Sequence, residues 1–101
     1  MSLLTFTDRV KDLVKDGSNI NYKVKFAFEE GVVHVDATQQ PDQVSNEDKD
    51  ADTTIHMSLN NANKFLDGQL NVTMAFMTGK MKVDGSMGVA MKVAKFVESK
   101  Q

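Results

Sequence analysis

The sequence has no cysteine, no tryptophan and only one proline among its 101 residues. Without cysteine the chain can form neither disulfides nor thiolate metal sites, and thiol catalysis is excluded. No apolar run approaches the roughly 18 residues that a membrane-spanning helix needs. The start of the chain also lacks the charged and apolar segments of a secretory signal. The length predicts a single domain over residues 1–101, and the lack of targeting signals predicts a cytoplasmic compartment.

Recognisable catalytic motifs are absent as well. The sequence contains no HExxH, no Walker loop, no GxGxxG and no local signature of a Ser-His-Asp triad. Its two histidines, His34 and His56, lie opposite the apolar residues of expected strands, so we predict that both are surface side chains. His34 shares its strand face with Asp36, but two ligands fall short of a metal site. We therefore expect no enzyme activity, no metal and no cofactor.

The charge of the chain is small but unevenly spread. A net charge of -2 argues against general nucleic-acid binding. Residues 36–52 hold six acids against one lysine, whereas residues 64–100 hold six lysines against three acids. Both runs fit solvated surfaces. Alternatively, the basic C-terminal half makes transient contact with an anionic membrane or a lipid head group.

Methionine and glycine are concentrated in one stretch. Residues 68–96 hold five of the seven methionines and four of the six glycines. Methionine is unbranched and polarisable, so it lines surfaces that adapt to variable shapes. The apolar residues of this stretch exceed what one small core needs. This excess indicates a domain built around an apolar cavity rather than a catalytic centre.

The periodicity of the apolar residues divides the chain into helices and strands. Helical spacing occurs in four segments: residues 5–16, 59–67, 71–78 and 87–98. Strand alternation occurs in four others: residues 20–28, 32–37, 52–58 and 80–84. A polar loop over residues 38–50 includes a candidate edge strand near 43–46. Thr5 and Asp8 resemble a capping box at the start of the first helix.

The first two strands form the clearest supersecondary unit. In residues 20–28 the apolar side chains alternate strictly and point to one face: Ile20, Tyr22, Val24, Phe26 and Phe28. A tight turn at residues 29–31 leads into the second strand, whose Val33 and Val35 point inward. We predict an antiparallel hairpin with one apolar face and one face toward solvent.

The last helix has two adjoining apolar stripes. The first consists of Met87, Ala90, Met91 and Ala94, and the second of Val89, Val93, Phe96 and Val97. A surface helix normally has a single stripe. Either this helix contacts both the core and something else, such as a partner, a membrane or an apolar ligand, or it is simply buried deeply in the core.

Residues 75–92, AFMTGKMKVDGSMGVAMK, resemble the sterol carrier protein 2 (SCP2) family. The strand at residues 52–58, DTTIHMS, fits the same pattern, as does the order of elements over nearly the whole chain. Thr78, Ser86 and Val89 are mild departures from the family's typical residues. The chain also lacks the tryptophan that family members often carry in the second strand, and the peroxisomal C-terminal ending of eukaryotic members.

The resemblance implies an α+β fold: a five-stranded, mostly antiparallel sheet with about four helices on one face, enclosing an apolar tunnel. It implies non-catalytic binding and carriage of fatty acids, acyl-CoAs, sterols or phospholipids in that tunnel. We expect eleven side chains to line it, although each also fits an ordinary core: Phe26, Phe28, Phe65, Met74, Phe76, Met77, Met81, Val83, Met87, Met91 and Phe96.

A second hypothesis is a protein-interaction or dimerisation module that uses the C-terminal helix. It predicts a dimer that Val93→Asp abolishes, whereas lipid binding predicts a folded protein whose ligand uptake Met77→Trp or Met91→Trp blocks. A lipid carrier is expected to be a monomer or at most a weak dimer.

Overall fold

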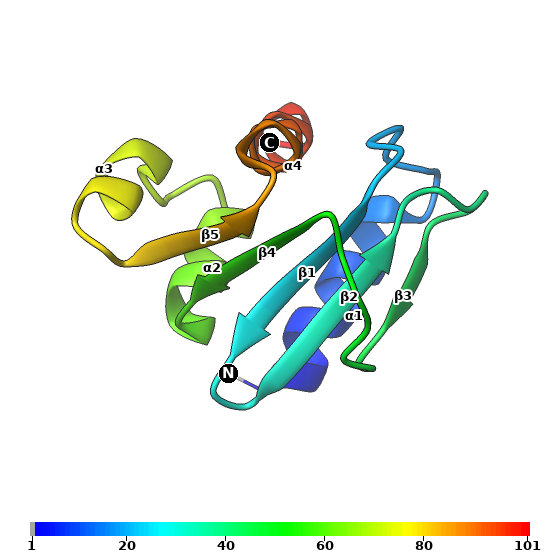
Figure 1. The fold of residues 1–101 in the computed structure, drawn as a ribbon, viewed down its shortest axis with the longest axis horizontal. Coiled ribbons are helices and arrows are strands. Elements are labelled where there is room, and N and C mark those ends of the chain that lie inside the picture. The colour runs from blue at the N-terminus through cyan, green and yellow to red at the C-terminus, as the bar shows by residue number, and fades with distance from the viewer. Residues whose placement is uncertain (1) are drawn as a thin grey trace.

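The structure, a computed structural model, describes residues 2–101 (Figure 1). Within this range the helices are α1 (Leu3–Val14), α2 (Leu59–Leu66), α3 (Val72–Met77) and α4 (Met87–Ser99). The strands are β1 (Lys23–Phe28), β2 (Gly31–Asp36), β3 (Gln43–Ser45), β4 (Thr53–Met57) and β5 (Met81–Gly85). The expected elements are therefore all present, including the short edge strand β3.

The five strands form one sheet in the order β3-β2-β1-β4-β5. β1 and β4 are parallel, and the other three neighbouring pairs are antiparallel. Buried side chains of all four helices join the inward side chains of the strands in one hydrophobic cluster, so the helices share one face of the sheet. This α+β arrangement confirms the predicted fold class and the predicted hairpin.

The first helix begins earlier than expected, because its N-cap is Ser2. The Ser2 side-chain oxygen accepts a hydrogen bond from the Thr5 backbone N–H at 3.1 Å. The predicted capping box at Thr5 and Asp8 is wrong, since Thr5 already lies in the first turn of α1. Gly17, with a φ of 87°, follows the helix in the left-handed conformation that glycine adopts without strain.

Strand β1 begins at Lys23 rather than at residue 20. Asn19 and Asn21 have φ values of 58° and 65°, and asparagine is one of the few residues that tolerate this left-handed region. Two such residues interrupt the extended backbone. Ile20 is still buried, but Tyr22 is 39% exposed, so its predicted inward orientation is wrong.

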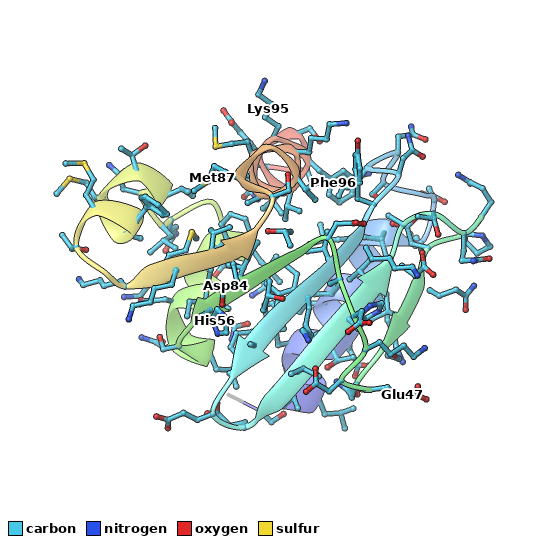
Figure 2. The ribbon with its side chains drawn as sticks, viewed as in Figure 1. Glu47, His56, Asp84, Met87, Lys95 and Phe96 are labelled. Atoms are coloured by element: carbon cyan, nitrogen blue, oxygen red, sulfur yellow. The ribbon has the colours of Figure 1, made fainter. Side chains whose placement is uncertain are left out.

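The two histidines lie in different surroundings. His56 is half-exposed on the outer face of the sheet, with its Nε2 2.8 Å from Asp84 Oδ2 (Figure 2). His34 is only 2% exposed, so the prediction of a surface side chain is wrong for this residue. The loop between β3 and β4 crosses the outer face of the sheet in front of β2 (Figure 1). His34 Nε2 donates to the Asp50 carbonyl of this loop at 2.9 Å.

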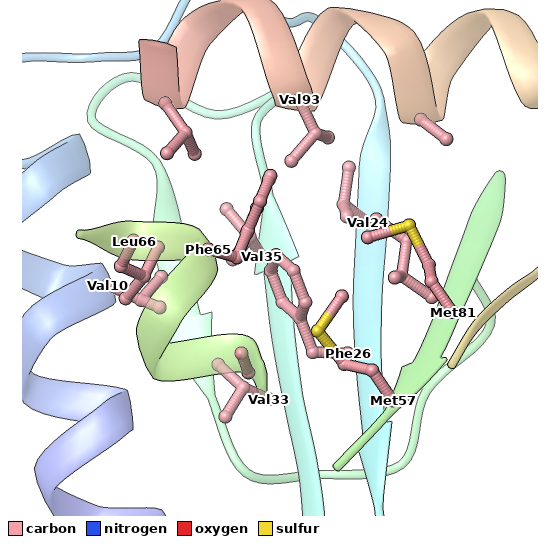
Figure 3. Packing of buried hydrophobic residues seen from close by; sticks show 14 of the residues in the cluster. Val10, Val24, Phe26, Val33, Val35, Met57, Phe65, Leu66, Met81 and Val93 are labelled. Carbon is pink, nitrogen blue, oxygen red and sulfur yellow. The ribbon is translucent and has the colours of Figure 1, made fainter. Parts of the chain in front are cut away.

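Part of the core lies between α1 and the centre of the sheet. Phe6 is completely buried, and its ring meets those of Phe26 and Phe28 edge-on at centroid distances of 5.6 and 5.1 Å. Val93 of α4 points into the same core (Figure 3). The valine stripe of α4 is therefore core. Val93→Asp would bury a charge and unfold the protein, so it cannot serve as a test of dimerisation.

Candidate functional site: an apolar pocket beside α3 and α4

A cavity of about 180 Å³ lies where α2, α3 and α4 meet β4 and β5. Twelve residues line it: Ile55, Phe65, Val72, Thr73, Phe76, Met77, Met81, Val83, Met87, Ala90, Met91 and Ala94. All of them except Thr73 are apolar. The cavity carries no titratable side chain, so it offers neither an acid nor a base to a bound molecule.

The floor of the pocket is built by strand alternation. Met81 and Val83 point to the helix side of β5, and Ile55 lies directly opposite Val83 on β4. Between them, Lys82 points to the outer face. A pleated pair of strands therefore supplies a purely apolar surface under the helices.

Helix α4 forms one wall through its first apolar stripe. Met87, Ala90, Met91 and Ala94 recur at helical spacing and all line the pocket. The two alanines are short, so they leave space between the helix and β5. Ser86 caps this helix by accepting a hydrogen bond from the Val89 backbone N–H at 3.2 Å.

Helix α3 forms the other wall and is itself only lightly held. Its single buried residue is Ala75, while Phe76 and Met77 line the pocket with much of their surface still exposed. Asn71 caps its start by accepting from the Met74 backbone N–H at 3.0 Å. Gly79 ends it with a φ of 77°.

The structure places seven of the eleven predicted lining residues at this pocket: Phe65, Phe76, Met77, Met81, Val83, Met87 and Met91. Phe26 and Phe96 instead border a separate cavity of about 30 Å³ between α1 and α4. Phe28 packs against Phe6, and Met74 is 53% exposed outside the pocket. That the seven residues contact a lipid, and that a continuous tunnel exists, stay predictions.

Five lining residues were missed by sequence reasoning: Ile55, Val72, Thr73, Ala90 and Ala94. A signal was available for the two alanines, because they share the first stripe of the last helix with Met87 and Met91. Ile55 also alternates inward in its predicted strand. Small or β-branched side chains were overlooked because the space they leave is not visible in a sequence.

None of the ionisable side chains within residues 2–101 lines the pocket. Within residues 2–101, no three histidine, aspartate or glutamate side chains are placed to share a metal ion. None of the helices in that range is long and apolar enough to cross a membrane. His56 Nε2 lies within hydrogen-bond distance of Asp84 Oδ2, and both side chains lie on the outer face of the sheet (Figure 2).

Comparison with known proteins identifies relatives over nearly the whole chain. The family model described as the SCP-2 sterol transfer family matches residues 3–98. Sterol carrier protein 2 from Gallus gallus is 34% identical over 103 residues, covering 91% of this chain and 19% of that protein. The chain therefore spans about a fifth of the length of this relative.

Two solved structures share the fold. Sterol carrier protein 2 from Yarrowia lipolytica in its apo form superposes with a TM-score of 0.77 at 22% identity, covering 94% of this chain and 88% of the other. Palmitated SCP2L2 from Aedes aegypti gives a TM-score of 0.69 at 22% identity, with coverages of 96% and 95%. Both are similar to this chain in the order and arrangement of their elements.

Proposed function

The chain belongs to the SCP-2 sterol transfer family, a family of lipid-binding and lipid-transfer domains, and from this we propose that it binds the acyl chain of a lipid in the pocket beside α3 and α4. The observation that carries this proposal is the pocket's lining, which is apolar at eleven of its twelve residues. The protein performs no chemistry on the ligand, and its proposed role is to hold and carry it.

Burial of methylene groups supplies the binding energy. Each buried CH₂ contributes roughly 0.8 kcal/mol, and association and ordering costs offset a large part of the sum. Micromolar or sub-micromolar affinity is the resulting expectation. We expect broad selectivity among the acyl chains of different lipids, because methionine side chains adapt to different apolar shapes.

The chemistry of the lining favours an acyl chain over a sterol ring system as the buried group. A buried sterol hydroxyl needs a hydrogen-bond partner, and only Thr73, near the exposed start of α3, offers a side-chain hydroxyl. A fatty acid, an acyl-CoA or a phospholipid can leave its polar head in water. The related Aedes domain is described as palmitated, which supports the same choice.

The volume of the pocket implies that α3 or the methionines move when a ligand enters. An engineered apolar cavity of about 150 Å³ holds one benzene, and drug-sized ligands occupy roughly 300–1,000 Å³. The cavity of about 180 Å³ therefore accommodates only part of a long chain as it stands. Helix α3 is the wall that yields most easily, because Ala75 is its only buried residue.

The test is binding of a fluorescent fatty acid in solution, together with native mass spectrometry of the protein purified from cells. We expect saturable binding at a ratio of one to one and a co-purified acyl lipid. Ala94→Phe fills the pocket from α4 and should weaken binding at least tenfold, whereas Leu4→Phe on α1 should not change it. Circular dichroism checks that both variants fold. A wild-type protein that binds no fatty acid, or an Ala94→Phe protein that binds it equally well, contradicts the proposal.

A further inference from the structure

The apolar side chains at the pocket continue onto the surface of the molecule. Five of the seven large hydrophobic side chains that are exposed within residues 2–101 belong to α3 and the first half of α4: Met74, Phe76, Met77, Met87 and Met91. We call them the methionine surface. Met77 is 74% exposed, although it also lines the pocket. In Figure 2, α3 stands at one side of the molecule with several side chains directed away from the sheet.

The surroundings of the methionine surface are basic. Residues 72–99, from α3 to the end of α4, contain four lysines and two acids, which leaves a formal charge of +2. Because the whole chain carries -2, the remaining residues carry -4. The segment that supplies ten of the twelve pocket-lining residues therefore carries a net positive charge, although Lys82 in this segment points to the outer face of the sheet.

The lysines that flank the methionine surface are free to meet another anion. Lys80 follows the glycine that ends α3, and Lys95 lies one helical turn after Met91 on the same side of α4. Within the described range, neither lysine is paired with an acidic side chain. Of the two acids in this part, Asp84 is already engaged by His56.

We propose that the methionine surface docks onto a lipid bilayer that contains anionic lipids, so that the pocket opens toward the membrane. Apolar side chains beside lysines are the pattern of surfaces that lie in the bilayer interface. Each lysine near an anionic leaflet adds to the attraction. The inference rests on the proposed function, since it names the surface from which the acyl chain enters the pocket.

The same charges disfavour a second copy of this chain as the occupant. In a two-fold dimer the identical surface is presented by both subunits. Lys80 and Lys95 of one copy would then approach the same lysines of the other, and like charges in an interface are unfavourable. An anionic bilayer, in contrast, offers an apolar interior to the methionine surface and negatively charged head groups to the lysines.

The experiment is co-sedimentation with vesicles of phosphatidylcholine alone and of phosphatidylcholine with about 30% phosphatidylserine. Wild-type protein should bind the mixed vesicles and be released as salt shortens the screening length. Lys95→Glu should weaken this binding at least about fivefold. Met74→Ser should weaken it by a similar factor. Two exposed residues of α1 provide matched controls, Lys11→Glu and Leu4→Ser, which should bind as the wild type does.

Met74 and Lys95 do not line the pocket, so both variants should still bind the fluorescent fatty acid in vesicle-free solution. Vesicle binding that depends on these two residues supports docking even if no fatty acid binds, in which case only the proposed function fails. Equal binding of all variants, or binding without any preference for phosphatidylserine, overturns the docking proposal. A wild-type dimer that Met74→Ser converts to a monomer in sedimentation velocity also overturns it, because the surface would then be a protein interface.

Discussion

Helices α1 and α3 pack at opposite ends of the same sheet, and they use their apolar residues differently. Helix α1 buries Phe6, Thr7, Val10 and Val14, whereas α3 buries only Ala75. The remaining apolar side chains of α3 border a cavity or face outward. The core is therefore filled at the α1 end of the sheet, whereas at the α3 end it is partly empty. The difference suggests that stability comes mainly from the α1 end, leaving the α3 end able to rearrange around a ligand.

The largest expected effect compares one substitution at the two ends. Phe6→Ala should lower the free energy of unfolding by about 3–5 kcal/mol, because it removes a fully buried ring that contacts two others. Phe76→Ala should cost less than about 1 kcal/mol, because its side chain is 46% exposed beside an existing cavity. Urea unfolding curves measure both values. Equal losses would show that the two ends are equally well packed.

Hydrogen exchange should reveal the same contrast without mutation. The free energy of opening for amides of α3 should lie roughly 2 kcal/mol or more below that for α1, since regions with few buried contacts open first. Addition of oleate should slow exchange in α3 and change α1 little. Mass-spectrometric detection after proteolysis gives the necessary segment resolution. Slower exchange confined to α1 would place the ligand outside the pocket.

The glycines at the two ends of β5 offer a smaller comparison. Gly79 and Gly85 have φ values of 77° and 94°, so alanine at either position incurs about 1–2 kcal/mol of backbone strain. A Cβ at Gly85 would also lie 2.5 Å from the Asp52 carbonyl oxygen, whereas one at Gly79 meets nothing within 4 Å. Gly85→Ala should therefore be more destabilising by about 1–3 kcal/mol in thermal or urea unfolding. Similar losses would mean that the end of β5 relaxes as freely as the end of α3.

The order and type of the elements were predictable because each leaves a periodic or capping signal in the sequence. The alternating strand pattern predicted the hairpin, and Ser86 predicted the start of α4. The predicted start of the first strand was wrong because Asn21 has a left-handed backbone conformation that interrupts the strand. Such a residue leaves the alternation of apolar and polar residues in the sequence unchanged. The pattern failed at His34 because burial there depends on a loop from a distant part of the chain.

The pocket was less predictable than the fold. Helical spacing placed Met87 and Met91 on one stripe, and the structure has both at the cavity. In α3, which has only six residues, periodicity cannot separate an outward Met74 from an inward Phe76. A cavity also forms where small side chains fail to fill the space between two elements. The pattern of apolar residues does not show whether Ala90 borders such a space or packs against a neighbour.

The smallest expected effect concerns Asp36, at the end of β2 in the filled half of the sheet. A hydrogen bond from the Thr38 hydroxyl, assisted by the Thr38 backbone N–H and by the charge of Lys23, holds the pKa of this carboxyl below its usual value. A lowered pKa in the folded state means that the carboxylate stabilises the fold above its unfolded pKa. This contribution is lost as the pH falls through the folded pKa.

Thr38→Val should therefore lower the free energy of unfolding at pH 7, by less than about 1 kcal/mol because the site is partly solvated. The difference from wild type should shrink as the pH is lowered from 7 toward about 2, because the carboxyl becomes protonated first in the unfolded state and then in the folded state. Thr78→Val at the end of α3 is the matched control, because the Thr78 hydroxyl donates to the uncharged Met74 carbonyl at 2.7 Å. Its effect should be the same at both pH values. If Thr38→Val also proves independent of pH, its hydroxyl stabilises the turn without acting through the Asp36 charge, and the two ends of the sheet differ in packing alone.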